Sequence, residues 1–539
     1  MLRRSFLLFT FYLFTTAAFA QTAKPKLVVG LVVDQMRWDY LYRFNALYGD
    51  GGFKRLLKEG FSAENTFIPY VPTYTAVGHT CVYTGSVPAI SGIVGNNWFD
   101  KTTGKNVYCT EDSTVLTVGN PGSRAGKMSP ANMWVTTIGD ELRLSNNFKS
   151  KVIGIALKDR GAILPAGHSA NAAYWYDAGK WITSTHYMGV LPIWVEQFNG
   201  QDLAGKYMSQ DWNTLMPISN YDLSTEDNKP YESTIKGIST STFPHKLTAI
   251  ADSLKYESFR TTPFANTFTF DFAKAAIENE NLGSNTVTDF LAVSISSTDY
   301  VGHAFGPNSV EVEDTYLRLD KDIADFLQYL DAKLGKGNYT VFLSADHAVA
   351  HIPAFLAEHK IPAGNFEDAD IRRELNTMIE KDFGVRNAVQ SLQNYQVYLN
   401  INELERQGKD VDAVKKAIIK VLKAKPFIIA AFETEKLAAT TLPEPQKTML
   451  ANGFNPKRSG DIQFTLKAGY FDGGTKGTTH GLWNPYDAHI PCVFFGWGVK
   501  RGKTNRETYM TDIAPTIAAM LQIQMPNGSV GKVITELIK

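Results

Sequence analysis

Residues Leu27-Val-Val-Gly-Leu-Val-Val33, with Asp34 directly after them, form the first of several short apolar runs in this 539-residue chain. β-branched side chains occupy both faces of such runs, as expected of parallel strands that are covered by helices. Similar runs follow at residues 151–157, 290–295, 339–343 and 490–495, and helical patterns separate them, the clearest at 313–331 and 511–521. This alternation predicts an α/β fold with a doubly wound, mostly parallel sheet flanked by helices.

Two regions fit this pattern less well. Residues 174–245 are rich in Trp, Tyr and polar turns, and residues 361–471 contain a predicted helix near 411–422 and predicted strands at 395–400 and 461–466. We interpret both regions as insertions that form a cap or side subdomain. Residues 21–539, with these two insertions included, are predicted to form a single domain.

The composition excludes several classes of protein. The chain is 44% hydrophobic and 20% charged, and 54 Lys and Arg balance 54 Asp and Glu, which excludes a disordered chain, a collagen and a disulfide scaffold. A formal net charge of zero supplies no basic field, so we expect no nucleic acid as a polymer ligand. The three cysteines, Cys81, Cys109 and Cys492, allow at most one disulfide, and the sequence leaves open whether any two of them pair.

The first twenty residues, MLRRSFLLFTFYLFTTAAFA, have the pattern of a signal peptide. Arg3 and Arg4 precede an apolar run at residues 6–14, and Ala18-Phe19-Ala20 is a small-x-small cleavage pattern. A membrane anchor is the weaker interpretation because the apolar run is short. The mature chain is therefore predicted to start at Gln21 and to reside in the periplasm or outside the cell, with no membrane association after cleavage.

Polar residues follow nearly every predicted strand. Asp34 follows the first run, Asp299 and His303 follow the run at 290–295, and Asp346-His347 follows the run at 339–343. Ligands of open α/β sheets bind at the carboxyl ends of the strands, and a mixture of Asp and His favours zinc. Each residue alone could be a turn former or a helix cap, but that interpretation would have to hold independently on several strands.

Lys158-Asp-Arg160 follows the run at 151–157 in the same way. A regular β alternation places Lys158 and Arg160 on the same side of the chain, so both could approach one anionic group.

The segment Pro69-Tyr-Val-Pro-Thr-Tyr-Thr-Ala-Val-Gly-His-Thr80 predicts a loop that leads into a helix. Thr75 lies near the predicted helix N-terminus, where a hydroxyl can serve as a nucleophile toward phosphorus or simply cap the helix. On this segment alone, Thr73 or Thr75 as an N-cap is the simpler interpretation. His79 is predicted to be structural.

Seven landmarks in this order resemble the alkaline phosphatase superfamily of two-metal phosphate and sulfate esterases, over nearly the whole mature chain. They are Val33-Asp34, residues 73–79, Gly95-Asn-Asn-Trp98, Lys158-Asp-Arg160, Thr298-Asp-Tyr-Val-Gly-His303, Ser344-Ala-Asp-His347 and Gly477-Thr-Thr-His480. Within this superfamily, the sequence is most similar to the secreted bacterial, phosphate-irrepressible alkaline phosphatases, which have a threonine nucleophile. The resemblance implies a single catalytic domain that hydrolyses small phosphate monoesters through a covalent phospho-threonine intermediate.

The resemblance also implies roles for individual residues. Thr75 is the expected nucleophile, and two Zn²⁺ ions per chain are expected. The implied zinc ligands are Asp34, Asp346, His347 and the Thr75 oxygen for one ion, and Asp299, His303 and His480 for the other. Asn96, Lys158 and Arg160 are the implied binders of the phosphoryl oxygens. The serine-type enzymes have an arginine after the nucleophile and a magnesium site nearby, whereas Ala76 follows Thr75 here, so no structural Mg²⁺ is expected.

Two alternative functions stay open at this point. A phosphodiesterase or nucleotide pyrophosphatase of the same superfamily shares the zinc ligands and the threonine, although the pair Lys158 and Arg160 argues against it. A metal-free secreted binding module would explain the aromatic-rich insertions, but it would have lost part of the ligand set. A sulfatase is disfavoured because no Cys-x-Pro-x-Arg sequence is present. We expect the protein to act as a monomer.

Overall fold

A central sheet of eleven strands organises the computed structural model, which describes residues 24–539. Strand β1 (Leu27–Val33) lies between β10 (Tyr339–Ser344) and β9 (Asp289–Ile295) and runs parallel to both. The parallel part continues from β9 to β6 (Val152–Ala156) and β7 (Ala172–Asp177). All seven residues of β1 are buried, which explains why its sequence is apolar on both faces.

The other strands extend the sheet on both sides in the order β17-β2-β18-β10-β1-β9-β6-β7-β8-β5, with β19 pairing with β2. They are β2 (Phe61–Phe67), β5 (Thr117–Val118), β8 (Lys180–Ser184), β17 (His489–Ile490), β18 (Cys492–Gly496) and β19 (Gly502–Tyr509). The sequence grouped the run at 490–495 with the parallel strands, and this was wrong. Strand β18 is antiparallel to both β10 and β2, but four of its five residues are buried, so its composition resembles that of a parallel strand.

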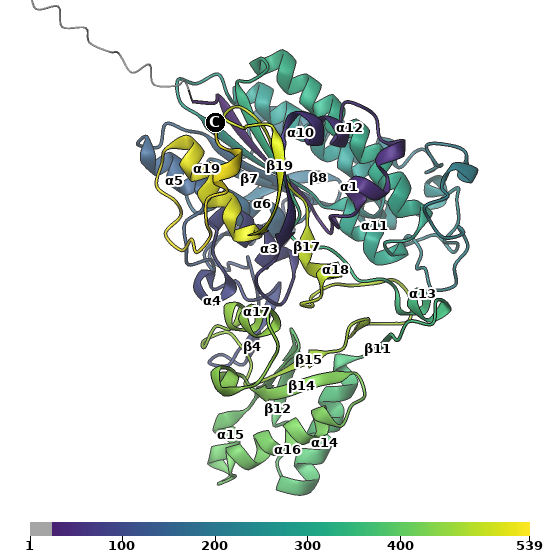
Figure 1. The fold of residues 1–539 in the computed structure, drawn as a ribbon, viewed down its shortest axis with the longest axis vertical. Helices are drawn as coiled ribbons and strands as arrows, with labels where there is room; N and C mark the ends of the chain where they lie inside the picture. The colour runs from purple at the N-terminus through teal and green to yellow at the C-terminus, as the bar shows by residue number, and fades with distance from the viewer. Residues whose placement is uncertain (1–23) are drawn as a thin grey trace, which may run out of the picture.

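Two groups of helices cover the sheet, as the doubly wound prediction requires (Figure 1). One group contains α2 (Phe53–Glu59), α10 (Phe264–Asn279), α11 (Ser297–Phe305) and α12 (Val310–Leu334). The other group contains α3 (Thr75–Thr84), α5 (Ile138–Ser145), α6 (Asp159–Ala166) and α19 (Ile513–Leu521). Helix α12 includes the predicted helix at 313–331 and begins at an N-cap, because the Ser309 side chain accepts a hydrogen bond from the Val312 N–H.

The two regions interpreted as insertions differ in the structure. Residues 172–184 form β7 and β8 of the central sheet, so the expected boundary at residue 174 falls inside a core strand. The following segment contains the short helices α7 (Ile193–Gly200) and α8 (Leu203–Tyr207) and long connections. It packs on the main body through residues such as Trp212, which is buried in the large hydrophobic core.

Residues 361–471 build a second, smaller body below the main one in Figure 1. Its four-stranded sheet has the order β12-β13-β15-β14, with bounds Val389–Gln393, Gln396–Leu399, Ile462–Leu466 and Ile428–Glu433. Helices α14 (Asp368–Phe383), α16 (Val411–Lys423) and α17 (Gln446–Gly453) accompany the sheet. A separate hydrophobic cluster around Leu375, Ile418 and Phe464 forms its core. We refer to residues 361–471 as the side subdomain.

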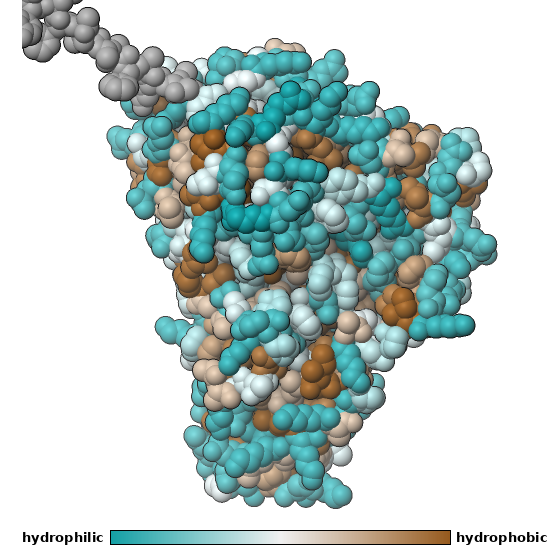
Figure 2. Space-filling model, in the orientation of Figure 1, coloured by the Kyte–Doolittle hydropathy of each residue, from teal (hydrophilic) through white to brown (hydrophobic). Residues whose placement is uncertain are grey.

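Polar side chains cover most of the face drawn in Figure 2, and its apolar residues lie in small separate groups. Within residues 24–539, no helix is both long enough and apolar enough to cross a bilayer. The predicted signal peptide lies outside the described residues. Cys81, Cys109 and Cys492 are buried and unbonded to one another, which answers the question that the sequence left open.

Candidate active site

The carboxyl ends of β10, β1 and β9 meet at one edge of the sheet because these three strands are parallel neighbours. Asp34 directly follows β1, and its N–H donates to the Ile295 carbonyl at the end of β9 over 3.0 Å. Asp346 and His347 follow β10, and α11, which carries Asp299 and His303, follows β9. The fold therefore brings five of the predicted ligands from three chain segments to one place.

Asp34, Asp346 and His347 form a fully buried group that we call the buried set. His347 Nε2 lies 3.4 Å from Asp34 Oδ1 and 3.3 Å from Asp346 Oδ2. His347 Nδ1 lies 3.0 Å from the Ala348 carbonyl, which can only accept, so Nδ1 carries the proton and Nε2 presents its lone pair. Histidines that bind a metal through one ring nitrogen typically donate the other ring N–H to a carbonyl or carboxylate in this way.

Asp299, His303 and His480 form the outer set. His303 Nε2 lies 3.1 Å and His480 Nε2 3.8 Å from Asp299 Oδ1. His303 Nδ1 donates to the Thr478 carbonyl over 2.7 Å, and His480 Nδ1 donates to the Thr73 carbonyl over 2.6 Å. Both Nε2 atoms are thereby free to face a cation. The His303 side chain is 35% exposed, in contrast to every member of the buried set.

Asp299 lies at the junction of the two sets. Potential ligand atoms of Asp299, His303 and His480 all lie within 4.8 Å of one another, and so do those of Asp34, Asp299 and His347. The resemblance implied Asp346 as the third member beside Asp34 and His347, and Asp346 contacts His347 as described above. Asp299 thus faces both sets through one carboxylate.

The chemistry of these donors fits divalent metal ions. Asp34 Oδ1 and Asp346 Oδ2 are buried and have no hydrogen-bond partner among the described residues, which is costly for carboxylates unless a cation compensates them. Burial and the neighbouring Asp346 raise the pKa of Asp34 well above its ordinary value. Burial alone would also raise the pKa of Asp299, but His303 and Lys158 outweigh it and lower that pKa well below the usual range.

Lys158 joins the two sets electrostatically. Its Nζ lies 2.6 Å from Asp34 Oδ2 and 2.5 Å from Asp299 Oδ2, and the residue is almost fully buried. Burial alone would lower the pKa of Lys158, but Asp299 and Asp34 outweigh it and raise that pKa above its ordinary value. Lys158 is therefore charged and directed at the predicted site.

The expectation that β alternation orients Lys158 and Arg160 was wrong. Strand β6 ends at Ala156, Lys158 is the N-cap residue of α6, and Arg160 lies in the first turn of that helix. Arg160 Nη1 donates to the Tyr108 hydroxyl over 3.1 Å, and that hydroxyl donates to Asp159 Oδ1 over 2.8 Å. Tyr108 therefore orients Arg160. No spacing signal in the sequence connects the two residues, which are brought together only by the fold.

Thr75 is the first residue of α3, and its Oγ1 lies 3.4 Å from His347 Nε2. Neither threonine caps this helix, because the N-cap residue is Tyr74 and the Thr73 hydroxyl donates to the Leu482 carbonyl. The N–H of Ala76 is instead satisfied by Asn96 Oδ1 over 2.9 Å. The Thr75 hydroxyl is consequently left facing the buried set, with Asn96 beside it.

His79 lies one turn further along α3, and its Nδ1 lies 3.3 Å from Asp346 Oδ2 of the buried set. Its Nδ1 donates to the Thr75 carbonyl over 2.9 Å, and its Nε2 lies 2.8 Å from the Ser294 hydroxyl. The contacts to Thr75 and Ser294 hold the start of α3 against β9, as a structural role requires.

The side subdomain contacts the segment that carries Asn96. The hairpin of β3 (Asn97–Asp100) and β4 (Lys105–Tyr108) starts directly after Asn96. Asn394, in the turn between β12 and β13, donates to the Asn97 carbonyl over 2.8 Å. The guanidinium of Arg458 lies over the rings of Trp98 and Trp134 at 4.5 and 4.3 Å.

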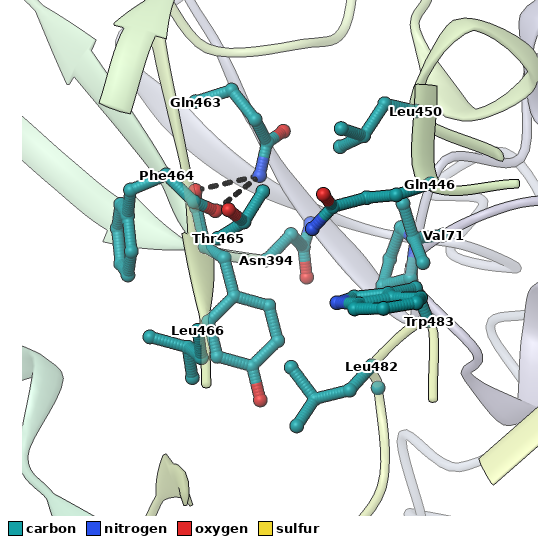
Figure 3. A pocket seen from close by; sticks show the side chains of 13 residues that line it. Val71, Asn394, Gln446, Leu450, Gln463, Phe464, Thr465, Leu466, Leu482 and Trp483 are labelled. Atoms are coloured by element: carbon teal, nitrogen blue, oxygen red, sulfur yellow. Dashed lines mark hydrogen bonds between the residues drawn. The ribbon is translucent and has the colours of Figure 1, made fainter. Parts of the chain in front are cut away.

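A pocket lies between the side subdomain and the loops on either side of the site (Figure 3). It is lined by Val71 and Pro72, which precede Thr75, and by Leu482 and Trp483, which follow His480. Gln446 also lines it, and neither polar atom of its buried amide has a partner among the described residues. The loops before Thr75 and after His480 therefore line the same pocket as residues of the side subdomain.

Comparison with known proteins adds independent findings. Residues 28–488 match the family model described as type I phosphodiesterase / nucleotide pyrophosphatase. The chain is 55% identical over 526 residues to alkaline phosphatase PhoV of Synechococcus elongatus, covering 97% of this chain and 95% of that protein. It is 56% identical over 535 residues to a Myroides odoratus protein named calcium-transporting ATPase, covering 98% and 97%.

A third relative is similar in both sequence and structure. The chain is 51% identical over 518 residues to alkaline phosphatase PafA of Elizabethkingia meningoseptica, covering 96% of this chain and 95% of that protein. The crystal structure of PafA matches with a TM-score of 0.94 over 96% of this chain and 99% of that one. A solved PafA variant carries substitutions of a threonine, an asparagine, a lysine and an arginine with the same spacing along the chain as Thr75, Asn96, Lys158 and Arg160.

Proposed function

The chain belongs to the type I phosphodiesterase / nucleotide pyrophosphatase family of the alkaline phosphatase superfamily, and we propose that it is an alkaline phosphatase in which Thr75 attacks phosphate monoesters. The observation that carries the mechanism is the direction of the Thr75 hydroxyl, which caps nothing and faces His347 of the buried set. Two relatives that match nearly the whole chain are named alkaline phosphatases. The geometry supports hydrolysis of phosphate esters, in contrast to the transport that the name of the Myroides relative implies.

The two sets would hold two zinc ions, the buried set with the Thr75 oxygen as a further ligand. When bound, the ions would supply positive charge that favours the alkoxide of the attacking hydroxyl and neutralises the departing oxygen. Thr75 Oγ1 then forms a bond to phosphorus while the bond to the ester oxygen breaks, and the alcohol leaves. Water subsequently cleaves the phospho-threonine, which returns the Thr75 hydroxyl and releases inorganic phosphate.

Lys158, Arg160 and Asn96 account for a preference for monoesters. The three non-bridging oxygens of a monoester share two negative charges, whereas a diester has two such oxygens and one charge. Lys158 and Arg160 offer two cations to these oxygens, and Asn96 retains its Nδ2 donor because its Oδ1 accepts from Ala76. A second ester substituent would leave part of this set unpaired, which argues against a phosphodiesterase. A metal-free binding module is disfavoured because all six predicted ligands are present.

The test is the ratio of kcat/KM for a monoester and for a methyl diester with the same leaving group. The double variant Lys158→Ala/Arg160→Ala should lose several kcal/mol toward the monoester, since charge-assisted contacts contribute roughly 1.5–3 kcal/mol each. The loss toward the diester should be much smaller. Arg386→Ala is the matched control, because this arginine is 81% exposed and pairs with Glu380 on the side subdomain.

Zinc content must be measured beside these rates, because Lys158 also contacts two ligand carboxylates. Arg160→Ala alone provides a cleaner comparison, since the contacts of Arg160 are to Tyr108. An equal fall for both esters in this single variant would mean that Arg160 binds phosphate generally, and the phosphodiesterase alternative would regain support.

We also propose that the protein is exported and acts as a monomer. The support for export is the pattern of residues 1–20, and N-terminal sequencing of the protein from a periplasmic fraction should give Gln21 as its first residue. Light scattering should give the mass of one chain.

A further inference from the structure

Gln35 occupies an unusual place at the end of β1. It directly follows the ligand Asp34, it is only 2% exposed, and its φ of 65° lies in the left-handed region that few residues other than glycine adopt. A left-handed residue turns the chain sharply. As a result, both the backbone N–H and the side chain of Gln35 reach the predicted ligands.

Gln35 hydrogen-bonds to one carboxylate of each set. Its backbone N–H donates to Asp346 Oδ1 of the buried set over 3.2 Å. Its side-chain Nε2 donates to Asp299 Oδ1 of the outer set over 2.7 Å. Lys158 also contacts both sets. We have proposed, however, that its positive charge binds the phosphoryl oxygens of the substrate. Gln35 is neutral, and both its backbone N–H and its side-chain NH₂ donate to predicted ligands.

The amide of Gln35 fits into a space that only glycine leaves open. Gly302 lies on α11 between Asp299 and His303, and a Cβ atom at this position would lie 1.9 Å from Gln35 Oε1. The amide is therefore packed against the same helix that presents two outer ligands. Because Asp299 Oδ1 can only accept, the NH₂ group must face it, which places Oε1 against Gly302.

We propose that Gln35 is a positioning residue that fixes the Asp299 carboxylate for the outer metal and ties it to the buried set. This inference rests on the proposed two-metal function. A replacement by a residue without a side-chain donor, other than proline, keeps the backbone donor to Asp346 and removes only the side-chain donor to Asp299. Loss of the side chain should therefore weaken the outer metal site selectively.

The experiment measures zinc bound per chain over a series of buffered free zinc concentrations, using the mature protein. Wild type should bind two ions. In Gln35→Ala the dissociation constant of the ion at the outer set should rise about 10–100-fold, as is typical when a residue that hydrogen-bonds to a metal ligand is lost. The dissociation constant of the ion at the buried set should stay within about twofold of the wild-type value. At limiting zinc the variant should hold one ion per chain.

A second variant and a control separate positioning from folding. Gln35→Met keeps a long, buried side chain without a donor, and it should show the same selective loss even if Gln35→Ala is poorly folded. Gln446→Met changes a glutamine that is 1% exposed and whose side chain makes no hydrogen bond within residues 24–539. This variant should bind both ions as wild type does. Gly302→Ala tests the contact from the other side, because its methyl group would displace the Gln35 amide and should reproduce the loss.

Two different results would overturn two different statements. If wild type binds two ions but both are weakened equally in Gln35→Met, or neither is, Gln35 is not a positioning residue for the outer site. If wild type itself binds fewer than two ions at saturating zinc, the two-metal function fails, whatever the variants do.

Discussion

The two ligand sets are built in different ways, although they share one carboxylate. The buried set comes from the ends of two adjacent strands, β1 and β10, and its members have no exposed surface. The outer set comes from helix α11 and from the loop of His480, and the His303 side chain is partly exposed. The central sheet thus fixes one set, whereas the other depends on a helix and on a loop that follows the side subdomain. We expect the outer set to be the more labile one.

The largest expected loss of activity follows substitution of Thr75, whose hydroxyl faces the buried set. Thr75→Ala should abolish phospho-enzyme formation and lower kcat by at least about 10³-fold, because the attacking oxygen is removed. Thr75→Ser should retain much of the activity because that oxygen survives. The measurement is single-turnover trapping of labelled phospho-enzyme together with steady-state kcat.

Thr75→Ala would contradict this assignment if its kcat remained within about tenfold of wild type, since the hydroxyl would then contribute at most about 1.4 kcal/mol. Thr73→Ala is the matched control. Its hydroxyl bonds to Leu482 and Gly481, so it should affect stability more than the covalent step.

Removing one ligand from each set should have the next largest effect. His303→Ala should lose the outer ion, with an affinity loss of more than about 100-fold, because a direct ligand matters more than its supporting partner. The buried ion should remain. Asp346→Ala should lose the buried ion and also destabilise the protein, because it leaves Asp34 and His347 buried without their partner. Zinc content and thermal unfolding measured on the same samples separate the two outcomes.

Two results would contradict the expected difference between the buried set and the outer set. A His303→Ala protein without any zinc would show that the two sets form one cooperative unit. An Asp346→Ala protein as stable as wild type would show that burying Asp34 and His347 without Asp346 costs little stability.

Chelation should distinguish the two sets by rate. The outer ion should leave first, since a chelator can approach through the exposed His303, and the buried ion should follow at least about tenfold more slowly. Zinc released over time is measured with a colorimetric indicator. Release of both ions in a single phase would indicate that opening of the whole site limits both.

The same contrast explains how much the sequence alone could predict. Asp34 and Asp346-His347 were predicted because each follows an apolar strand, and strand ends are visible as a change from apolar to polar residues. The doubly wound fold was confirmed for the same reason. The direction of β18 could not be predicted, because burial on both faces gives antiparallel and parallel strands the same composition.

Contacts between residues that are far apart in the sequence could not be predicted from the spacing of residues. His480 is predicted as a ligand only through the resemblance, since a glycine-rich loop has no periodicity. The link from Tyr108 to Arg160 and the bond from Gln35 to Asp299 depend on side-chain directions that tertiary packing determines. The positive φ of Gln35 also contradicts local preference, and such exceptions are common at functional sites.

The smallest expected effect is on the pH dependence of stability, at the contact between Asp368 and Asp472 that anchors the His480 loop. This loop begins after Asp472, whose Oδ1 accepts from the N–H of Asp368 over 2.8 Å. Burial and the neighbouring Asp472 raise the pKa of Asp368 from 3.8 to about 8. A carboxyl whose folded pKa is raised contributes stability that is fully present below its unfolded pKa and is lost as the pH rises toward the folded pKa. Ionisation of Asp368 should therefore destabilise this anchor progressively between about pH 4 and pH 8.

Asp368→Asn tests this directly, because the amide stays neutral at every pH. Between pH 5 and pH 9 the thermal midpoint of wild type should fall by up to about 2 °C more than that of the variant, a small shift because the side chain is only partly buried. Asp370→Asn, in the same turn of α14 but exposed and paired with Arg373, should follow wild type. If Asp368→Asn keeps the wild-type pH slope, the Asp368 carboxyl does not couple to Asp472. The lability of the outer set would then come from the exposure of His303 alone, and the loop of His480 would be as firmly anchored as the strand ends that hold the buried set.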